Sequence, residues 1–384
     1  MPRSAPPAAL LVVLVALVAG CAAPSRPPMS IDEGRARVAA KLPATLAERG
    51  GWAADIHAAM ESLAIELTDA NICAIVAVTE QESGFKVDPV VPNLAAAVWK
   101  EIDLQRERAG IPKLVLQAAL ALPSTTGRSY RERLDAAKTE RELSDIFEDF
   151  IGRVPLGKTF LEDRNPVRTG GPMQVSVAFA KSHAAVRRYP YPISGSLREE
   201  VFSRRGGMYF GIAHLLDYPA GYDRYVYRFA DFNAGHYASR NAAFQKALSE
   251  VAGTPLALDG DLLRYEKGEP SATPGDTETA ARAIARRLEL APEQIRRDLE
   301  LGRTRDFEGT RLYKRVFALA DAAGGKAAAR AVVPQIALSS AKFTRKLTTE
   351  WFATRVVERH RGCMARAAKS PSAMLWPEPT ASAR

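Results

Sequence analysis

Apolar residues recur every three to four positions through nearly all of the chain after residue 31, and this spacing constrains the fold most. It predicts helices, because an α-helix turns once in 3.6 residues, and no stretch alternates convincingly with a period of two. The sequence therefore predicts an all-α fold. The helices expected from this spacing are 69–83, 93–109, 113–122, 131–150, 208–216, 223–232 and 238–251.

The first 20 residues have a different composition. Arg3 precedes an apolar run, residues 8–18, which is too short to span a bilayer but typical of a secretory signal. The run ends in Leu17-Val18-Ala19-Gly20-Cys21. This ending predicts cleavage before Cys21, and an ordinary signal peptide with an incidental cysteine is the alternative. Residues 22–30 are small and Pro-rich, as expected of a tether.

The residues around the expected cleavage site resemble the bacterial lipobox, in which the new N-terminal cysteine is acylated. The resemblance implies a membrane anchor at Cys21. Lipoproteins held at the inner membrane usually carry Asp after the cysteine, whereas Ala22 stands here. An outer-membrane lipoprotein facing the periplasm is therefore expected, and no later apolar run is long enough to cross a membrane.

Charge and cysteine content fit this compartment. A formal net charge of +9 suits an acidic partner such as the cell-wall polymer or an anionic membrane surface. Nucleic acid is excluded as a partner mainly by location, and the sequence indicates no particular protein partner. Cys73 and Cys363 form an even pair in an oxidising compartment, which favours a disulfide; two buried thiols are the alternative.

Pro- and Gly-rich stretches and the periodic segments divide the chain. The expected organisation is a signal peptide (1–20), a lipidated cysteine and tether (21–31), a first helical domain (32–253) with a helical insert (about 92–165), a loop (254–276), a C-terminal helical region docked on the core (277–367) and a disordered tail (368–384).

Glu82 is the candidate catalytic acid. On a helix 69–83, which Thr68 can cap, it falls nearer than Glu80 to the apolar stripe formed by Ile72 and its neighbours. Burial and the negative end of a helix both favour the protonated form of a carboxyl group. An acid held protonated near neutral pH is what glycosidic cleavage requires, whereas a partly exposed Glu at a helix end is the alternative.

Three short motifs occur in one order: Glu82-Ser83-Gly84-Phe85, Gly171-Pro172-Met173-Gln174 and Phe232-Asn233-Ala234-Gly235. They resemble the Glu-Ser-x-Phe, Gly-Leu-Met-Gln and Tyr-Asn-Ala-Gly motifs of the soluble lytic transglycosylases, which have the lysozyme-like fold. The resemblance covers residues 68–91 and 168–252. It implies a lysozyme-like helical domain with inserted helices and a C-terminal helical extension, acting on peptidoglycan glycan strands.

The resemblance also implies residue roles. Glu82 would protonate the oxygen between N-acetylmuramic acid and N-acetylglucosamine, and would then accept the proton of the muramoyl 6-hydroxyl as a 1,6-anhydro ring closes. Ser83, Met173, Gln174, Asn233 and Gly235 would bind the substrate or shape its groove. Turn-stabilising amides are the alternative for Gln174 and Asn233, and core packing is the alternative for Met173.

The chain departs from the family in two places. Phe232 stands where the family has a tyrosine beside the acid, and Tyr227 or Tyr237 would have to supply the missing hydroxyl. The insert, 92–165, separates the first two motifs, which lie close together in the family. It would either close one end of the groove, favouring cleavage at chain ends, or bury the groove in a protein without activity.

Other functions remain as alternatives. A hydrolytic muramidase would need a second carboxylate, for which Asp88, Asp163 and Asp231 are candidates. A non-catalytic peptidoglycan-binding or envelope-scaffold lipoprotein is another, and a C-terminal partner-docking module is a third. His236 lies beside the third motif, as a substrate contact or a capping side chain. The histidines lack paired metal-ligand spacing, so no metal or cofactor is expected.

Overall fold

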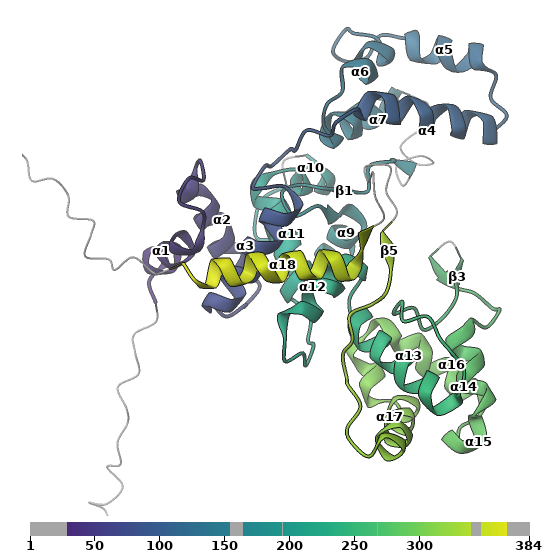
Figure 1. Ribbon diagram of the computed structural model, residues 1–384. Coiled ribbons are helices and arrows are strands. Elements are labelled where there is room, and N and C mark those ends of the chain that lie inside the picture. Colours follow the sequence, from purple (N-terminus) through teal and green to yellow (C-terminus); the bar gives the residue numbers. More distant parts are fainter. Residues whose placement is uncertain (1–28, 154–163, 194, 267, 339–346, 367–384) are drawn as a thin grey trace, which may run out of the picture.

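The structure is a computed structural model that describes residues 29–153, 164–193, 195–266, 268–338 and 347–366. The expected signal peptide, Cys21, most of the tether and the whole of the expected tail (368–384) lie outside these ranges, as does Asp163. The chain is mainly helical, and the predicted all-α architecture is confirmed at that level (Figure 1).

The described α-helices are α1 (Ile31–Lys41), α2 (Arg49–Ser62), α3 (Asp69–Glu82), α4 (Leu94–Arg108), α5 (Lys113–Ala121), α6 (Tyr130–Ala136), α7 (Glu140–Arg153), α9 (Val177–Val186), α10 (Leu197–Val201), α11 (Arg204–Leu216), α12 (Tyr225–Ala234), α13 (Ala238–Ala252), α14 (Asp276–Ala283), α15 (Ala285–Leu288), α16 (Pro292–Glu300), α17 (Arg311–Gly324) and α18 (Thr349–Met364). Two 3-10 helices, η2 (Leu301–Arg303) and η3 (Arg305–Gly309), separate α16 from α17.

Three short antiparallel pairs were not predicted. They are β1 (Thr169–Gly170) with β2 (Val175–Ser176), β3 (Tyr265–Glu266) with β4 (Glu269–Pro270), and β5 (Ala337–Leu338) with β6 (Leu347–Thr348). Each strand has two residues, which is too few for a period of two to appear in the sequence. The pair β3–β4 lies within the stretch that was expected to be loop.

The first lobe is built around α3. Thr68 caps this helix, because its Oγ1 accepts a hydrogen bond from the Asn71 backbone N–H at 3.1 Å. Every residue from Ile72 to Thr79 is buried, so α3 is covered on all sides rather than on one stripe. Its neighbours in the same hydrophobic core come from α2, α9, α11, α12 and α18.

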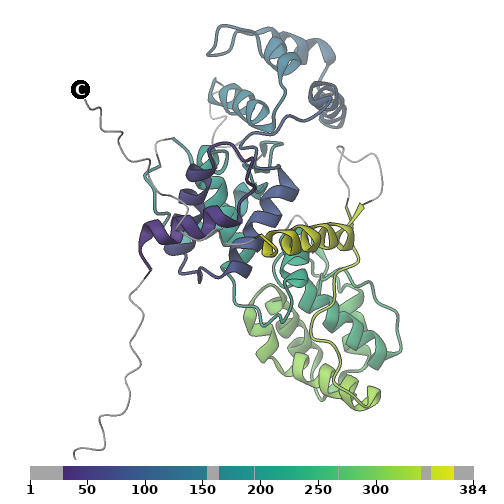
Figure 2. The ribbon, with the colours of Figure 1, turned by 60° about the vertical axis from the view of Figure 1, so that its left-hand side comes forward.

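The second lobe has its own core. Phe244 of α13 is fully buried there with Phe307 and the apolar face of α17. The first helical domain was expected to extend to residue 253 and so to include α13. Instead, α13 packs mainly with α14 and α17 and belongs to the second lobe. The chain then returns, and α18 packs against α3 and α12 of the first lobe. Figure 2 shows α18 (yellow) lying against the first lobe after leaving the second.

A disulfide fixes this return. Cys73 in α3 and Cys363 in α18 are bonded, with their Cα atoms 5.5 Å apart, and both side chains are fully buried. Arg366 donates to the Lys41 carbonyl oxygen, so α1 joins the same junction. The C-terminal helix thus belongs to the fold of the first lobe, although 290 residues separate the two cysteines.

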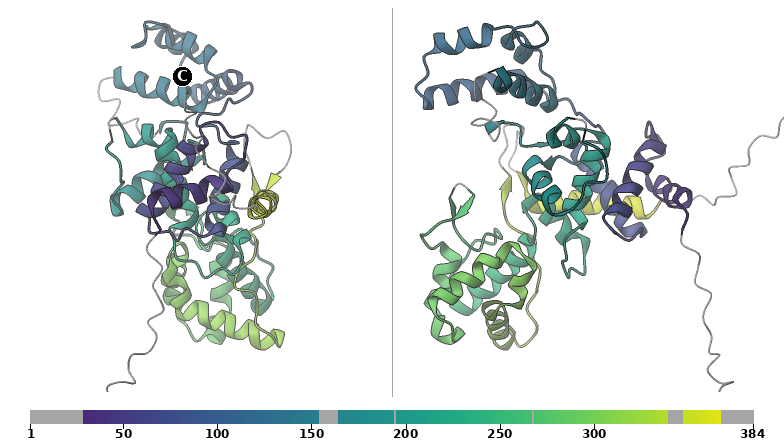
Figure 3. Two further views of the ribbon diagram at one scale, coloured as in Figure 1. Left: turned by 90° about the vertical axis from the view of Figure 1, so that its left-hand side faces the viewer. Right: turned by 180° about the vertical axis from the view of Figure 1, so that it is seen from behind.

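The helices of the insert form a separate arm. Its small core gathers apolar side chains of α4–α7, including Tyr130 and Ile146, and extends to Val167 and Phe202 of the first lobe. Arg198 of α10 donates to the Val167 carbonyl oxygen at 2.7 Å at this junction. From there the arm projects away from both lobes, as Figures 1 and 3 show.

Candidate functional site

Glu82 is the last residue of α3 and is partly buried. The turn that follows is tightly defined, because Gly84 and Phe85 both have positive φ values, 59° and 62°. The Phe85 ring anchors the turn: it is 7% exposed and meets the Trp52 ring edge-on at 5.3 Å. A left-handed phenylalanine is uncommon, and here its burial holds the backbone at the end of the helix.

Glu80 has two basic partners. Its carboxylate lies between two guanidinium groups near the C-terminal end of the chain, 3.7 Å from Arg359 and 3.8 Å from Arg366. Glu80 therefore ties α3 to the C-terminal segment. Glu82, which belongs to the first of the three motifs, stays the candidate for acid chemistry.

A hydrogen bond links the first two motifs. The Ser83 hydroxyl lies 2.8 Å from the carbonyl oxygen of Pro172 and 3.3 Å from that of Thr79. A hydroxyl has a single hydrogen to donate, and here it is used within the protein. Ser83 was predicted as a substrate contact; the structure shows it as a link between two turns.

Gly171 begins the second turn, which closes the hairpin β1–β2. Its φ is +72°, and a Cβ on it would lie 2.2 Å from the Val201 carbonyl oxygen, so only glycine fits. Gln174 also has a positive φ, 49°, and its backbone N–H donates to the Gly171 carbonyl oxygen at 3.1 Å. Its side-chain Nε2 donates to the same oxygen at 3.2 Å. The Gln174 amide thus stabilises its own turn and leaves Oε1 as an acceptor.

Met173 lies in the core. Its side chain is fully buried and packs against α11, where a Cβ on Gly211 would lie 2.5 Å from Met173 Cβ. A fully buried side chain cannot contact a glycan. The prediction that Met173 binds substrate is therefore wrong. Met173 instead packs between its turn and α11 and supports the turn.

The third motif ends α12. Gly235 has φ 108° and ψ 151°, a conformation that glycine adopts readily. Asn233 is partly buried, and its Oδ1 accepts a hydrogen bond of 2.9 Å from Oγ1 of Thr349, the first residue of α18. Thr349 is fully buried. Sequence reasoning missed this residue, because nothing local to Thr349 shows that it lies beside Asn233.

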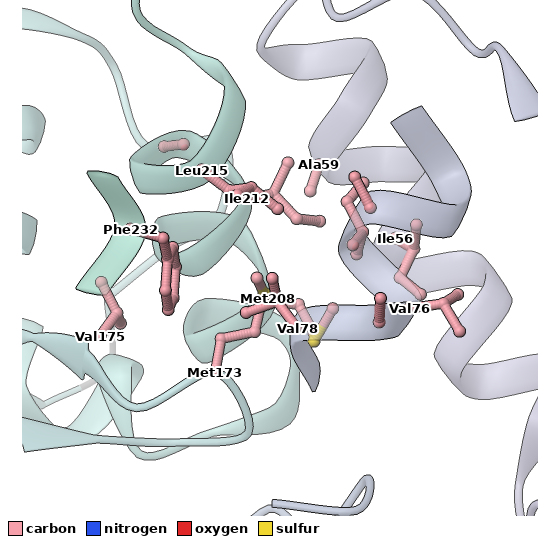
Figure 4. Packing of buried hydrophobic residues seen from close by; sticks show 14 of the residues in the cluster. Ile56, Ala59, Val76, Val78, Met173, Val175, Met208, Ile212, Leu215 and Phe232 are labelled. Atoms are coloured by element: carbon pink, nitrogen blue, oxygen red, sulfur yellow. The ribbon is translucent and has the colours of Figure 1, made fainter. Parts of the chain in front are cut away.

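Tyr237 does not supply the hydroxyl that the sequence analysis expected beside Glu82. Its ring is 4% exposed, and its hydroxyl donates to the Pro219 carbonyl oxygen at 3.3 Å. Phe232 itself is buried and contacts the His214 ring at 5.1 Å. Figure 4 shows Phe232, Met173, Met208 and Val78 within one group of packed side chains. The third motif therefore shares a hydrophobic core with the turn of Met173 and with α3.

The histidines near the third motif are structural. His214 Nε2 lies 3.2 Å from the Phe232 carbonyl oxygen, and His236 Nε2 lies 2.7 Å from that of His214. His236 stacks between His214 and Tyr218, with centroids 4.6 and 4.1 Å away. Burial, helped by the neighbouring His236, lowers the pKa of His214 to about 3, and burial also lowers the pKa of His236. Both rings are neutral near pH 7.

Asp231 does not serve as a second catalytic carboxylate. It is fully buried and accepts hydrogen bonds from the hydroxyls of Tyr218 and Tyr222 and from the backbone N–H groups of Tyr237 and Ser239. Burial raises the pKa of Asp231, while the hydrogen bonds from Tyr222, Ser239 and Tyr218 oppose the rise. Asp231 thus holds the start of α13. Asp231 is therefore excluded as the second carboxylate of a muramidase.

Asp88 lies at the base of the arm. Burial raises the pKa of its carboxyl group, and a hydrogen bond from Thr139, next to α7, opposes the rise. Its position is set by the insert rather than by the three motifs. Of the three aspartates named for a muramidase, Asp88 is the one within the described residues that remains a candidate for the second carboxylate.

A cavity of about 660 Å³ lies elsewhere in the first lobe, between the end of α2 and the connection from α11 to α12. Arg187, Tyr222 and Arg228 are among its lining residues, and none of the three motifs contributes to it. Within the described ranges, no cluster of three or more His, Cys, Asp or Glu side chains is placed to hold a metal ion. In the same ranges, every helix is too short or too polar to cross a bilayer.

The chain belongs to the family described as "Protein of unknown function (DUF1615)", whose model matches residues 45–366. It is also 48% identical over 368 residues to the "Uncharacterized protein YaiW" of Escherichia coli (strain K12). That similarity covers 95% of this chain and the whole of the relative. No solved structure matches the chain.

Proposed function

We propose that this protein is a lytic transglycosylase with a lysozyme-like first lobe, which cleaves peptidoglycan glycan strands and leaves 1,6-anhydro-N-acetylmuramic acid ends. The observation that carries the proposal is the hydrogen bond between Ser83 and Pro172. It holds the turn of the candidate acid, Glu82, beside the turn that presents Gln174. These two turns carry the motifs that face each other across the sugar groove in the resembled family.

The second support is the packing beneath these turns. Gly211 allows Met173 to approach α11 closely, and Met173 shares its core with Phe232. Asn233, the next residue, is held by Thr349. Each motif is thus placed by buried neighbours, which is how a rigid site is supported.

The chemistry assigned to Glu82 uses one carboxylic acid in two steps. As acid, it donates its proton to the glycosidic oxygen while the bond to C1 of N-acetylmuramic acid breaks. As base, it accepts the proton of the 6-hydroxyl while that oxygen bonds to C1. Atoms balance without water, so the product carries an anhydro ring instead of a reducing end. Gln174 Oε1 and the Asn233 Nδ2 donors would hydrogen-bond the sugar.

The test is digestion of purified sacculi by the mature protein, with mass analysis of the released muropeptides. Glu82→Gln removes the acid and retains the shape of the side chain. Glu80→Gln is the matched control, because Glu80 lies on the same helix end, outside the three motifs, and its carboxylate pairs with Arg359 and Arg366. We expect anhydro products from the wild type and the Glu80→Gln variant, and none from the Glu82→Gln variant.

The same assay separates the rival functions. Reducing ends in place of anhydro ends would establish a hydrolytic muramidase. Binding to sacculi without release of any muropeptide, in a folded wild-type protein, would refute the enzyme and establish a non-catalytic wall-binding lipoprotein. The Ser83 hydroxyl and the Gln174 Nε2 already donate to backbone carbonyl oxygens. Among the rival functions, this favours the non-catalytic wall-binding lipoprotein.

We also propose that Cys21 carries the lipid that anchors the protein in the outer membrane, facing the periplasm. The lipobox-like ending of the apolar run and Ala22 after the cysteine support this. Mass spectrometry of the mature N-terminus tests the modification, and density separation of inner and outer membranes tests the location. An unmodified Cys21, or loss of the first 20 residues without acylation, would refute the anchor.

A further inference from the structure

The tip of the arm exposes an unusual amount of apolar surface. Twelve large apolar side chains are markedly exposed in the described ranges, and five of them fall between residues 104 and 122. They are Leu104, Ile111, Leu114, Val115 and Leu122, exposed by 39, 41, 78, 58 and 57%. Contiguous exposed apolar surface in a protein that functions in water marks a contact site.

Helix α5 presents two apolar faces. Leu116 and Leu120 point inward and pack in the core of the arm. Leu114, Val115, Ala118, Ala121 and Leu122 lie on the opposite side, within an arc of about 120° on a helical projection, and all five are exposed. A helix that needed only the arm's core would carry polar residues on this outer side. The outer stripe therefore has a second partner.

The charges around the stripe are mostly positive. Between residues 103 and 128 the chain carries Arg106, Arg108, Lys113 and Arg128 against Asp103 and Glu107, a local net charge of +2, and Arg106 pairs with both acids. From residue 109 to residue 127, Lys113 is the sole charge. An apolar stripe with basic residues at its margins is the pattern of helices that lie in the interface of anionic bilayers.

We propose that the outer face of α5 docks on a lipid bilayer with anionic headgroups. A second copy of the chain fits less well, because pairing two such faces would bring two positively charged margins together. At nine residues, or about 13 Å, α5 is too short to span a bilayer and would lie along its surface. Figure 1 shows α5 at the edge of the arm away from the two lobes, where a flat surface can reach it.

This inference is independent of the proposed enzyme and of the lipid on Cys21. The test therefore uses the mature chain with Cys21→Ser, so that no acyl group contributes. Binding is measured by flotation with vesicles of phosphatidylglycerol and phosphatidylethanolamine, and with vesicles of phosphatidylcholine alone. The variant Leu114→Ser/Val115→Ser removes the centre of the stripe. Val186→Ser, at an 86%-exposed site on α9, is the matched control for loss of exposed apolar surface.

We expect the protein to float with the anionic vesicles, more weakly as salt rises, and less with phosphatidylcholine. The double variant should lower the partition coefficient by at least about tenfold, whereas the control should leave it unchanged. Both variants should unfold at the wild-type temperature, because the altered side chains are exposed. No flotation of the wild type, or equal flotation of the double variant, would overturn the proposal. Self-association that the double variant abolishes, without vesicle binding, would assign the face to a second copy instead.

Discussion

Replacing Gly211 by alanine would place a methyl group against Met173 in the core of the first lobe. The new Cβ would lie 2.5 Å from Met173 Cβ and 2.6 Å from its Sδ, well inside van der Waals contact. Met173 is fully buried and cannot move into solvent. Overpacking of this kind costs about 1–3 kcal/mol, while alanine gains about 1 kcal/mol of helix propensity. We expect a net loss of up to about 2 kcal/mol.

Gly362→Ala is the matched control for this prediction. Gly362 lies in α18, is exposed, and has no atom within 4 Å of a Cβ placed on it, so alanine should add about 1 kcal/mol. Urea unfolding followed by tryptophan fluorescence measures both variants, since Trp52 is buried in the first lobe. The two free energies of unfolding should differ by about 1–3 kcal/mol. Equal stability of the two variants would refute the close packing of Met173 on α11.

Three further predictions follow from other contacts. Thr349→Val should lower kcat for sacculus digestion several-fold and Thr349→Ser should restore it, because only serine keeps the donor to Asn233; equal rates would contradict this positioning role. Replacing Cys73 and Cys363 together by alanine should lower the free energy of unfolding by up to roughly 5 kcal/mol, since their bond closes a loop of 290 residues, and denaturant titration with and without reductant measures it. His214 has a pKa of about 3 when folded against 6.5 ordinarily, so the unfolded chain binds more protons between these values. Stability should therefore fall as pH drops below about 6.5, by at most about 2 kcal/mol from this residue at pH 5, and His214→Phe should flatten that pH profile.

Local sequence signals predicted most helix boundaries well. Thr68 caps α3 as expected, and the segment 113–122 corresponds to α5, Lys113–Ala121. The segment 131–150 was predicted as one helix, but the structure divides it into α6 and α7. Thr139 forms a bridge with Val90 and accepts from the Glu142 backbone N–H, which begins α7 there. The Glu142 carboxylate in turn accepts from the Thr139 backbone N–H, so the two residues form a capping box. This start signal is local, but apolar periodicity alone did not reveal it.

The candidate site stays a prediction. Its three motifs were found through their resemblance to those of the soluble lytic transglycosylases, and a hydrogen bond between Ser83 and Pro172 joins two of them. The roles of individual side chains needed the structure, because a four-residue pattern does not show which atoms are already hydrogen-bonded. Met173 and Ser83 changed role for this reason, and Asp231 lost its candidacy as a second carboxylate through its four donors.

The sequence by itself determined the helical class, the cap of α3 and the two cysteines available for a bond. These depend on interactions between near neighbours along the chain, which leave a periodic or local trace. Only the tertiary structure decided that α18 completes the first lobe, that α13 belongs to the second, and that Thr349 holds Asn233. Such contacts join residues that lie far apart in the sequence. Their geometry depends on how all the intervening helices pack, and no local pattern encodes it.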